Sequence, residues 1–432
     1  MQVHFLYWNV QAEGRIVRVL PEEPETSMKL HGWYLGAALI VAPAVALADA
    51  VLDWNEIGVA TVLAARQGPP GDARSMAMMH VAMFNAVNAI DLLYTPYRAE
   101  LRAPAGASVS AAAAAAAHTV LVRLFPERRE TLGKAYAASL KQISGERGVE
   151  AGVALGEQAG NDLLALRAND GVGVANVYRP ATSPGVYVPT TMPAGYDWRE
   201  VKPWFMTQPS QFRPEAPPLL TSAIWARDYN EVKEAGGLAS QKRTAEQTEV
   251  ARFWTATGAT TWNPVVRSLA TSKPRTLVQN ARLFALANMA ATDAYIAVFD
   301  GKYAFNFWRP VTAVRNGESD GNDATTTDVA WLPLVETPMH PEYPCAHCIT
   351  ASAVATVLEA EFGTGRVSTI VMTSPTLSGV RRRWERLWDY VKEVGNARVW
   401  GGIHYRNSTE IGERMGKEIG RLAVTSAMQP AQ

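Results

Sequence analysis

The 432-residue chain is long enough to bury a large hydrophobic core, as one domain or as two closely packed ones. Lys and Arg together number 41, as do Asp and Glu, so no basic excess indicates a nucleic-acid partner and no acidic tail is present. Two cysteines, three residues apart, exclude a disulfide framework that staples the whole fold but leave one local bridge open.

The first fifty residues predict a segment that is removed from the mature protein. Residues 28–50 begin with Met-Lys, continue as an apolar run and end in small residues, which is typical of a secretory signal peptide cleaved after Ala48 or Ala50. Residues 1–27 show no clear period, and we interpret them as a misassigned upstream extension. The apolar run of roughly fifteen residues is short for a membrane span. We therefore expect a periplasmic or secreted protein with no stable membrane span after cleavage, and no later segment that reaches spanning length without charges.

Residues 51–220 are predicted to form N-terminal helices followed by a long loop. The second helix is apolar on most sides, so we expect it to be buried, with His80, Asn85 and Asn88 bonded to its neighbours. Gly, Pro, Thr and aromatic residues dominate 169–220. We expect this loop to be ordered and to line a pocket, because disordered segments contain few aromatic residues. The predicted helices are 52–66, 72–93, 108–124, 127–143 and 147–168.

Residues 221–432 are predicted to form a second helical part. A helix at 275–300 is expected to end at Asp300-Gly301. The chain shows little alternating strand pattern and no internal repeat of fixed period. The fold class is therefore mainly α, a compact helical bundle assembly. The other predicted helices are 221–236, 243–257, 264–272, 346–361, 377–394, 395–400 and 408–427.

The chemical centre of the sequence is the stretch from His340 to Cys348, which reads His-Pro-Glu-Tyr-Pro-Cys-Ala-His-Cys. Its two prolines hold the approach extended, and a helix is predicted to begin directly afterwards. His347 would then lie in the first turn, where unpaired N–H groups and the helix dipole favour an anion beside which a histidine can transfer a proton. A proline-led helix start with a solvent-facing histidine fits this segment equally well.

Two cations flank an aromatic segment earlier in the chain. Lys302 and Arg309 are seven residues apart, so on one helix both would project from the same face, about 10 Å apart. Pro310 would end that helix. A solvated charged face is the alternative, but the aromatic residues between and beside the cations argue against a simply wet surface.

A third segment pairs Arg398 with His404. On a continuous helix these two side chains would point apart, but Gly401 and Gly402 could break the helix and bring both to one pocket. Cationic donors, a nucleophile or ligand and a proton-transfer group form the set of residues expected for an oxyanion site.

These three segments resemble the signature of the vanadium-dependent haloperoxidase and type 2 phosphatidic acid phosphatase (PAP2) superfamily. That signature reads Lys-x6-Arg-Pro, then Pro-Ser-Gly-His, then Ser-Arg-x5-His-x3-Asp. The order and the spacings match over the C-terminal third, and the length and the His-Pro-x-Tyr-Pro run resemble the bacterial haloperoxidase-like branch. The matching residues are Lys302, Arg309-Pro310, Pro344-Cys-Ala-His347, and Ala397-Arg398 to His404 with Ser408 in the last position.

The resemblance implies the PAP2/haloperoxidase type of helical bundle and a site for vanadate, which phosphate may equally fill. His404 would be the apical ligand of vanadium, or the nucleophile of an acid phosphatase that forms a phosphohistidine. His347 would be the acid–base group, and His340 would tune halide use or support the site from outside it. The implied substrates are hydrogen peroxide, a halide and an organic acceptor, or a phosphate ester, and a homo-oligomer is left open. The implied oxyanion contacts are Lys302, Arg309, Cys345, Ala346, Arg398 and His404.

The chain departs from the signature where Cys345, Ala346, Ala397 and Ser408 stand for Ser, Gly, Ser and Asp. As a free thiol, Cys345 would be a poorer donor than serine, and nearby cations would lower its pKa to give a thiolate that repels the anion. Peroxide or hypohalous acid would also oxidise it. A hydroxyl, or Glu410, would orient the apical histidine less strongly than aspartate.

The Cys-x-x-Cys spacing allows two further readings. One is a redox site, because a helix start favours a lowered thiol pKa and secretion favours a disulfide. The strand–helix context of thioredoxin-like proteins is absent, however. A zinc site built from Cys345, His347 and Cys348 lacks an obvious further ligand.

Overall fold

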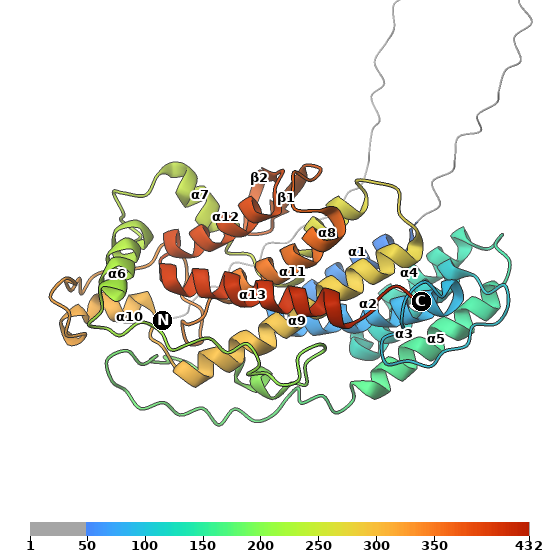
Figure 1. Cartoon of the computed structure of the whole chain (residues 1–432), viewed down its shortest axis with the longest axis horizontal. Helices are drawn as coiled ribbons and strands as arrows, with labels where there is room; N and C mark the ends of the chain where they lie inside the picture. Colours follow the sequence, from blue (N-terminus) through green and yellow to red (C-terminus); the bar gives the residue numbers. More distant parts are fainter. Residues whose placement is uncertain (1–48, 432) are drawn as a thin grey trace, which may run out of the picture. The chain divides into compact units, whose positions relative to one another are not determined.

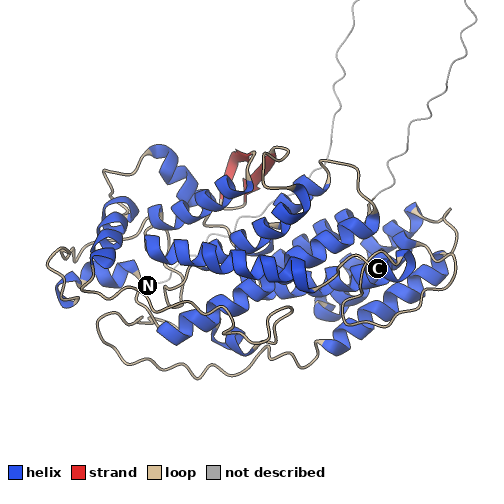
Figure 2. Ribbon diagram, in the orientation of Figure 1, coloured by secondary structure: helices blue, strands red, loops and turns tan. Residues whose placement is uncertain are grey.

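The computed structural model describes residues 49–431, and within them it is a helical assembly with one two-stranded hairpin (Figure 2). The predicted mainly α fold is confirmed. The predicted upstream extension at 1–27, and the predicted signal peptide at 28–50 except for its last two residues, lie outside the described residues.

The N-terminal helices have the predicted positions to within a few residues. Asp49 caps the first helix by accepting hydrogen bonds from the N–H groups of Val51 and Leu52. Asn85 and Asn88 each bond the backbone of the following loop, at Tyr97 and Tyr94, as expected of paired polar groups in a buried helix. The helices are α1 (Ala50–Ala65), α2 (Pro69–Asp91), α3 (Val109–Leu124), α4 (Arg129–Gln142) and α5 (Val149–Leu166).

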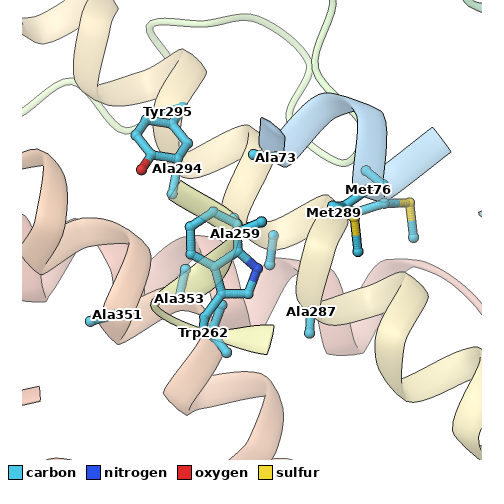
Figure 3. Packing of buried hydrophobic residues seen from close by; sticks show 14 of the residues in the cluster. Ala73, Met76, Ala259, Trp262, Ala287, Met289, Ala294, Tyr295, Ala351 and Ala353 are labelled. Carbon is cyan, nitrogen blue, oxygen red and sulfur yellow. The ribbon is translucent and has the colours of Figure 1, made fainter. Parts of the chain in front are cut away.

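The second part contains the longest helix, α9, which packs against α2, α11 and α13 (Figure 1). Figure 3 shows the buried Trp262 in a cluster with small side chains such as Ala259 and Ala353 and with the larger Met289 and Tyr295 of α9. The remaining helices are α6 (Ala223–Gly236), α7 (Ala245–Phe253), α8 (Asn263–Ala270), α9 (Leu277–Phe305), α10 (Pro310–Arg315), α11 (Ala346–Phe362), α12 (Leu387–Trp400) and α13 (Arg406–Ser426).

Helix α9 is long and apolar enough to cross a membrane, but it carries Arg282, Asp293 and Asp300, so it agrees with our expectation that no later segment reaches spanning length without charges. Its most apolar window is entirely buried among the described residues. Buried core helices meet the same criteria of length and composition, and α9 packs as one.

A stripe of glycines brings α13 into close contact with α11. A Cβ atom added at Gly412 would lie 2.7 Å from the carbonyl oxygen of Cys345, and one at Gly416 would lie 2.3 Å from that of Ile349. The four-residue spacing places these glycines on one helix face. A similar stripe on α5 faces α3, where a Cβ at Gly156 would lie 2.3 Å from the oxygen of Ala112.

The prediction of a helix over 377–394 is wrong for its first half. Residues Leu377–Trp384 form strand β2, which pairs antiparallel with β1 (Ile370–Ser374). Three consecutive arginines in β2 favour a helix by their intrinsic propensity, and strands this short show little alternation of apolar and polar residues. The predicted break at 394–395 is also wrong, since α12 is continuous.

The predicted loop at 169–220 is ordered. Apart from a 3-10 turn at Tyr196–Glu200 it is irregular, and its backbone is held by side chains of the helical core. The carboxylate of Asp293 accepts hydrogen bonds from the N–H groups of Trp204, Phe205 and Met206.

Candidate oxyanion site

Lys302 and Arg309 do not lie on one helix, which corrects the sequence-based geometry. Helix α9 passes Asp300-Gly301 and ends at Phe305, so Lys302 lies in its last turn. Asn306 then adopts a left-handed conformation and turns the chain. Arg309 is the N-cap of α10, and Pro310 begins that helix instead of ending one.

Lys302 anchors the His340–Cys348 stretch. Its buried ammonium donates to the carbonyl oxygens of Pro341, Glu342 and Pro344 at 3.0, 2.8 and 2.5 Å. An ammonium has three N–H donors, and all three face backbone. Burial lowers the pKa of Lys302 well below its usual value, and the charges of Arg309 and Arg398 lower it further.

Arg309 holds two motifs together. Its Nε donates to the carbonyl oxygen of His340 at 2.9 Å, and its Nη1 donates to that of Ile403 at 2.8 Å. The same Nη1 lies 3.3 Å from Nε2 of His404, and Nη2 lies 2.9 Å from Nδ1 of His340. Because a guanidinium only donates, Nε2 of His404 is an acceptor. Nδ1 of His340 lies between this donor and the carbonyl oxygen of Pro341 at 3.1 Å, so it can bond either one, depending on its tautomer. Burial lowers the pKa of Arg309 to about 10, which leaves it charged at neutral pH.

Arg398 retains unused donor capacity. Its Nη1 donates to the carbonyl oxygen of Trp254 at 2.5 Å, whereas its buried Nε has no hydrogen-bond partner. Burial and the charge of Arg309 lower the pKa of Arg398 to about 9. A buried N–H without a partner costs free energy, and an oxyanion oxygen would satisfy it.

His404 follows the helix break that the glycine pair predicts. Helix α12 ends at Trp400, and Gly402 has φ +77°. His404 is 1% exposed, and its Nδ1 lies 2.6 Å from Oε1 of Glu342. Burial lowers its pKa well below 6.5, and the charges of the neighbouring cations act in the same direction.

The other two histidines of the prediction lie in the same region. Nε2 of His347 lies 3.1 Å from the carbonyl oxygen of Ala256, so Nε2 carries the hydrogen and Nδ1 a lone pair. His340 contacts Arg309 as described and packs edge-on against Phe299. Burial lowers the pKa of both imidazoles well below the usual value, so both are neutral at pH 7.

The two cysteines form a disulfide, Cys345–Cys348, at the start of α11. The expected thiolate at Cys345, with its repulsion and its oxidation, is therefore absent. Cys345 Sγ also has no hydrogen to donate, and it accepts from the N–H of Cys348 at 3.2 Å. With the residues 0% and 1% exposed, neither sulfur is open to attack by an external thiolate, which leaves the redox reading without geometric support. Among residues 49–431 no group of three metal-ligating side chains favours the zinc reading.

A cavity of about 720 Å³ opens beside Arg309. The ordered loop supplies one wall, as predicted, and α10 and the segment before His340 supply the others. No lining residue is acidic. Its larger lining side chains are Tyr187, Trp308, Arg309, Val311, Arg315 and Met339.

These residues fit an oxyanion such as vanadate or phosphate. Nη1 of Arg309 lies 3.3 Å from Nε2 of His404, and the charges of Lys302 and Arg398 also act on this imidazole. Glu342 balances at most one of these three charges. Arg398 has a buried N–H to spare, and the first-turn N–H groups of α11 at Ala346 and His347 have no acceptor within the helix.

The sequence did not point to two contributors. Glu342 lies inside the His340–Cys348 stretch, but the signature assigns no role to that position. The segment after α7 supplies the carbonyl oxygens of Trp254 and Ala256, which bond Arg398 and His347. Backbone groups leave no residue-type signal, so only the structure reveals them. Ser408, in the position of the signature's aspartate, has its Oγ 3.4 Å from Nδ1 of His404.

Known proteins share this architecture. Residues 282–432 match the family model described as the VCPO second helical-bundle domain. The chain is 26% identical to vanadium chloroperoxidase of Curvularia inaequalis, over 82% of this chain and 78% of that protein.

Two solved structures of bacterial enzymes superpose on the fold. A vanadium-dependent iodoperoxidase matches with a TM-score of 0.76 at 21% identity, over 89% of this chain and 97% of that one. A vanadium-dependent chloroperoxidase in its holo form matches with a TM-score of 0.67 at 19% identity, over 83% and 92%. Residues 282–432 are thus similar to the second helical bundle of this family model, the chain is similar in sequence to a vanadium chloroperoxidase, and its fold is that of vanadium-dependent haloperoxidases.

Proposed function

We propose that the protein is a vanadate-dependent haloperoxidase that oxidises a halide with hydrogen peroxide. The observation that carries this proposal is the burial of three cations, Lys302, Arg309 and Arg398, whose charges act on His404, with Nε2 of His404 facing Arg309. A tetrahedral anion there would accept from Arg398 Nε and would raise the pKa of Lys302 again. The similarity to proteins named as chloroperoxidase and iodoperoxidase favours vanadate as that anion.

Bound vanadate would activate hydrogen peroxide toward attack by the halide. The net reaction consumes a proton: halide, hydrogen peroxide and H⁺ give hypohalous acid and water. The Nδ1 lone pair of His347 can receive and return that proton, because Nε2–H is held by the carbonyl oxygen of Ala256. Arg309 and Arg398 would position the oxyanion with their N–H donors, as preorganised donors do in other active sites, and the charge of Lys302 would help to neutralise it.

The cavity beside Arg309 would admit the halide and an organic acceptor. Its aromatic and apolar lining suits a neutral or anionic organic molecule, and the absence of acidic lining residues avoids repulsion of a halide.

A phosphatase is the second candidate, since the same Nε2 lone pair of His404 could attack phosphorus. Purified protein, reconstituted with vanadate, should brominate or iodinate a phenol-type dye in the presence of peroxide. Turnover of a phosphate monoester that vanadate inhibits, and that His404→Ala abolishes, would instead establish the phosphatase. Phosphate binding with neither activity would reduce the protein to an oxyanion binder.

We also propose that the protein is secreted after cleavage at Ala48. Cleavage there leaves Asp49 as the cap of α1, whereas cleavage after Ala50 would remove the cap and the first helical residue. N-terminal sequencing of secreted protein tests this, and a mature chain that begins before Met28 would contradict it.

A further inference from the structure

Glu342 and His404 come from different motifs and meet in the buried centre of the site. Oε1 of Glu342 lies 2.6 Å from Nδ1 of His404, and the two residues are 0% and 1% exposed. We infer that Glu342 is the positioning residue of His404 and replaces the aspartate that the signature places four residues after the histidine. The hydrogen bond stands on geometry alone, and only its consequence for anion binding rests on the proposed function.

The contacts on both ring nitrogens assign the same tautomer. Nε2 faces Arg309, which can only donate, and Nδ1 faces Oε1 of Glu342, an oxygen that already accepts from the N–H of Tyr405. Nδ1 therefore carries the hydrogen, and the Nε2 lone pair points toward the oxyanion site. A carboxylate on the remote nitrogen fixes ring orientation and makes the ligating nitrogen more basic.

Ser408 is the competing candidate, and its geometry is poorer. Its Oγ lies 3.4 Å from the same Nδ1, beyond the usual range for a hydroxyl hydrogen bond. A hydroxyl also carries no charge with which to increase the basicity of the ring. The hydroxyl of Ser408 also bonds the carboxylate of Glu342, and its carbonyl oxygen accepts from the N–H of Cys345 at 3.2 Å.

The backbone of Glu342 is fixed from two sides. Its carbonyl oxygen accepts from Nζ of Lys302 at 2.8 Å, and its N–H donates to the carbonyl oxygen of Phe307. Its Oε1 also accepts from the N–H of Tyr405, next to the histidine. One residue thus ties the end of α9 to the orientation of His404.

The signature's aspartate would lie on α13 beside His404, whereas Glu342 reaches the ring from the other motif. An aspartate at position 408 would face the same nitrogen, since Ser408 does. Nδ1 has one hydrogen, which only one carboxylate can accept. A second carboxylate beside Nδ1 would be buried without a donor of its own and would repel the first. The inference therefore predicts opposite effects of Ser408→Asp with and without Glu342.

The test uses full-length protein and two readouts. In ¹⁵N-histidine-labelled protein without vanadate, NMR should show that His404 populates only the tautomer with the hydrogen on Nδ1. The signal of His404 is assigned as the one that disappears in His404→Gln. Glu342→Gln keeps the size but removes the charge, and its amide can donate or accept. We expect it to give a mixture of tautomers and to weaken the vanadate Kd by about 10- to 100-fold.

Ser408→Ala is the matched control and should leave the tautomer unchanged and the Kd within about threefold of wild type. Ser408→Asp alone should weaken vanadate binding, and the Glu342→Gln/Ser408→Asp pair should bind more tightly than Glu342→Gln. The inference is overturned if Glu342→Gln leaves both the tautomer and the Kd as in wild type, or if Ser408→Ala changes them more. Failure of the haloperoxidase proposal would instead show as absent halogenation, with both readouts as predicted.

Discussion

Nη1 of Arg309 lies 3.3 Å from Nε2 of His404, so a cation faces the nitrogen that we place at the apical position. The same guanidinium donates from two different nitrogens, in a fixed planar geometry that an ammonium group lacks, to the carbonyl oxygens of His340 and Ile403.

Arg309→Lys should therefore weaken the vanadate Kd by about tenfold or more, because the fork geometry is lost while the charge is kept. Arg315→Lys is the matched control, since Arg315 lines the same cavity but bonds the carbonyl oxygen of Trp331. Titration of the apoprotein with vanadate measures both. Equal Kd values for the two variants would refute the role of Arg309.

Filling the cavity should separate access from anion binding. Thr312 lies on α10 in the cavity wall, half-buried. Thr312→Trp should lower kcat/KM for a bulky phenol at least about tenfold, because the indole occupies the space the acceptor needs, and should leave the vanadate Kd within about twofold. Thr425→Trp, on the exposed surface of α13, should change neither. Unchanged turnover in Thr312→Trp would show that acceptors react elsewhere.

The free energy of unfolding should decrease as the pH is lowered, because of His80, a buried histidine remote from the site. Burial lowers the pKa of His80 to about 3. Below pH 6.5, His80 is therefore protonated in the unfolded chain but stays neutral in the folded protein, which favours unfolding. His80 alone should cost about 2 kcal/mol between pH 6.5 and 5. Asp72 and Glu342, with pKa values raised to about 7, act in the opposite direction. The measurement is therefore the difference in urea stability between wild type and His80→Gln at each pH, and a pH-independent difference would contradict it.

The glycine stripe on α13 gives a direct test of close packing. Gly412→Ala should cost about 1–3 kcal/mol and should displace the backbone of Cys345, whose carbonyl oxygen the new Cβ would meet at 2.7 Å. Gly395→Ala is the control, because its nearest contact would be an ordinary 3.7 Å to Thr409. That variant should be neutral or slightly stabilising. Denaturant unfolding of both decides, and similar losses would argue against the close approach.

The disulfide predicts a simple thiol count. Denatured protein should show no free thiol before reduction and two afterwards. Cys345→Ser with Cys348→Ala restores a hydroxyl where the signature has one, so vanadate should bind severalfold more tightly. The same change should cost about 2 kcal/mol of stability, the chain-entropy contribution of so short a loop. Weaker vanadate binding in that variant would show that the sulfurs, not a hydroxyl, suit the site.

Spacing alone located the candidate site, because the family signature depends on short local intervals such as that from Arg398 to His404. It could not give the path between Lys302 and Arg309, since the left-handed Asn306 that separates them looks like any asparagine in a helical run. Helix positions followed from apolar content and caps, whereas the hairpin at 370–384 depends on tertiary contacts. One such contact is that of Arg382 with Glu393, eleven residues away.

The role of Glu342 escaped prediction for a different reason. A glutamate between two prolines belongs to no hydrophobic pattern of a helix or strand, and its partner, His404, is 62 residues away. Only the signature's missing aspartate hinted that another acceptor must exist, and the sequence offered Ser408 and Glu410 as nearer candidates.

Because Lys302, Arg309 and Arg398 repel one another, the melting temperature of this protein should also depend on whether the buffer contains an oxyanion. An anion that binds only the folded chain adds about 2.7 kcal/mol to the unfolding free energy at a hundred times its Kd. Protein purified in phosphate should thus melt later than the same protein in a buffer without oxyanions. A melting temperature would then depend on the anion that remains bound from purification as well as on the stability of the protein without the anion.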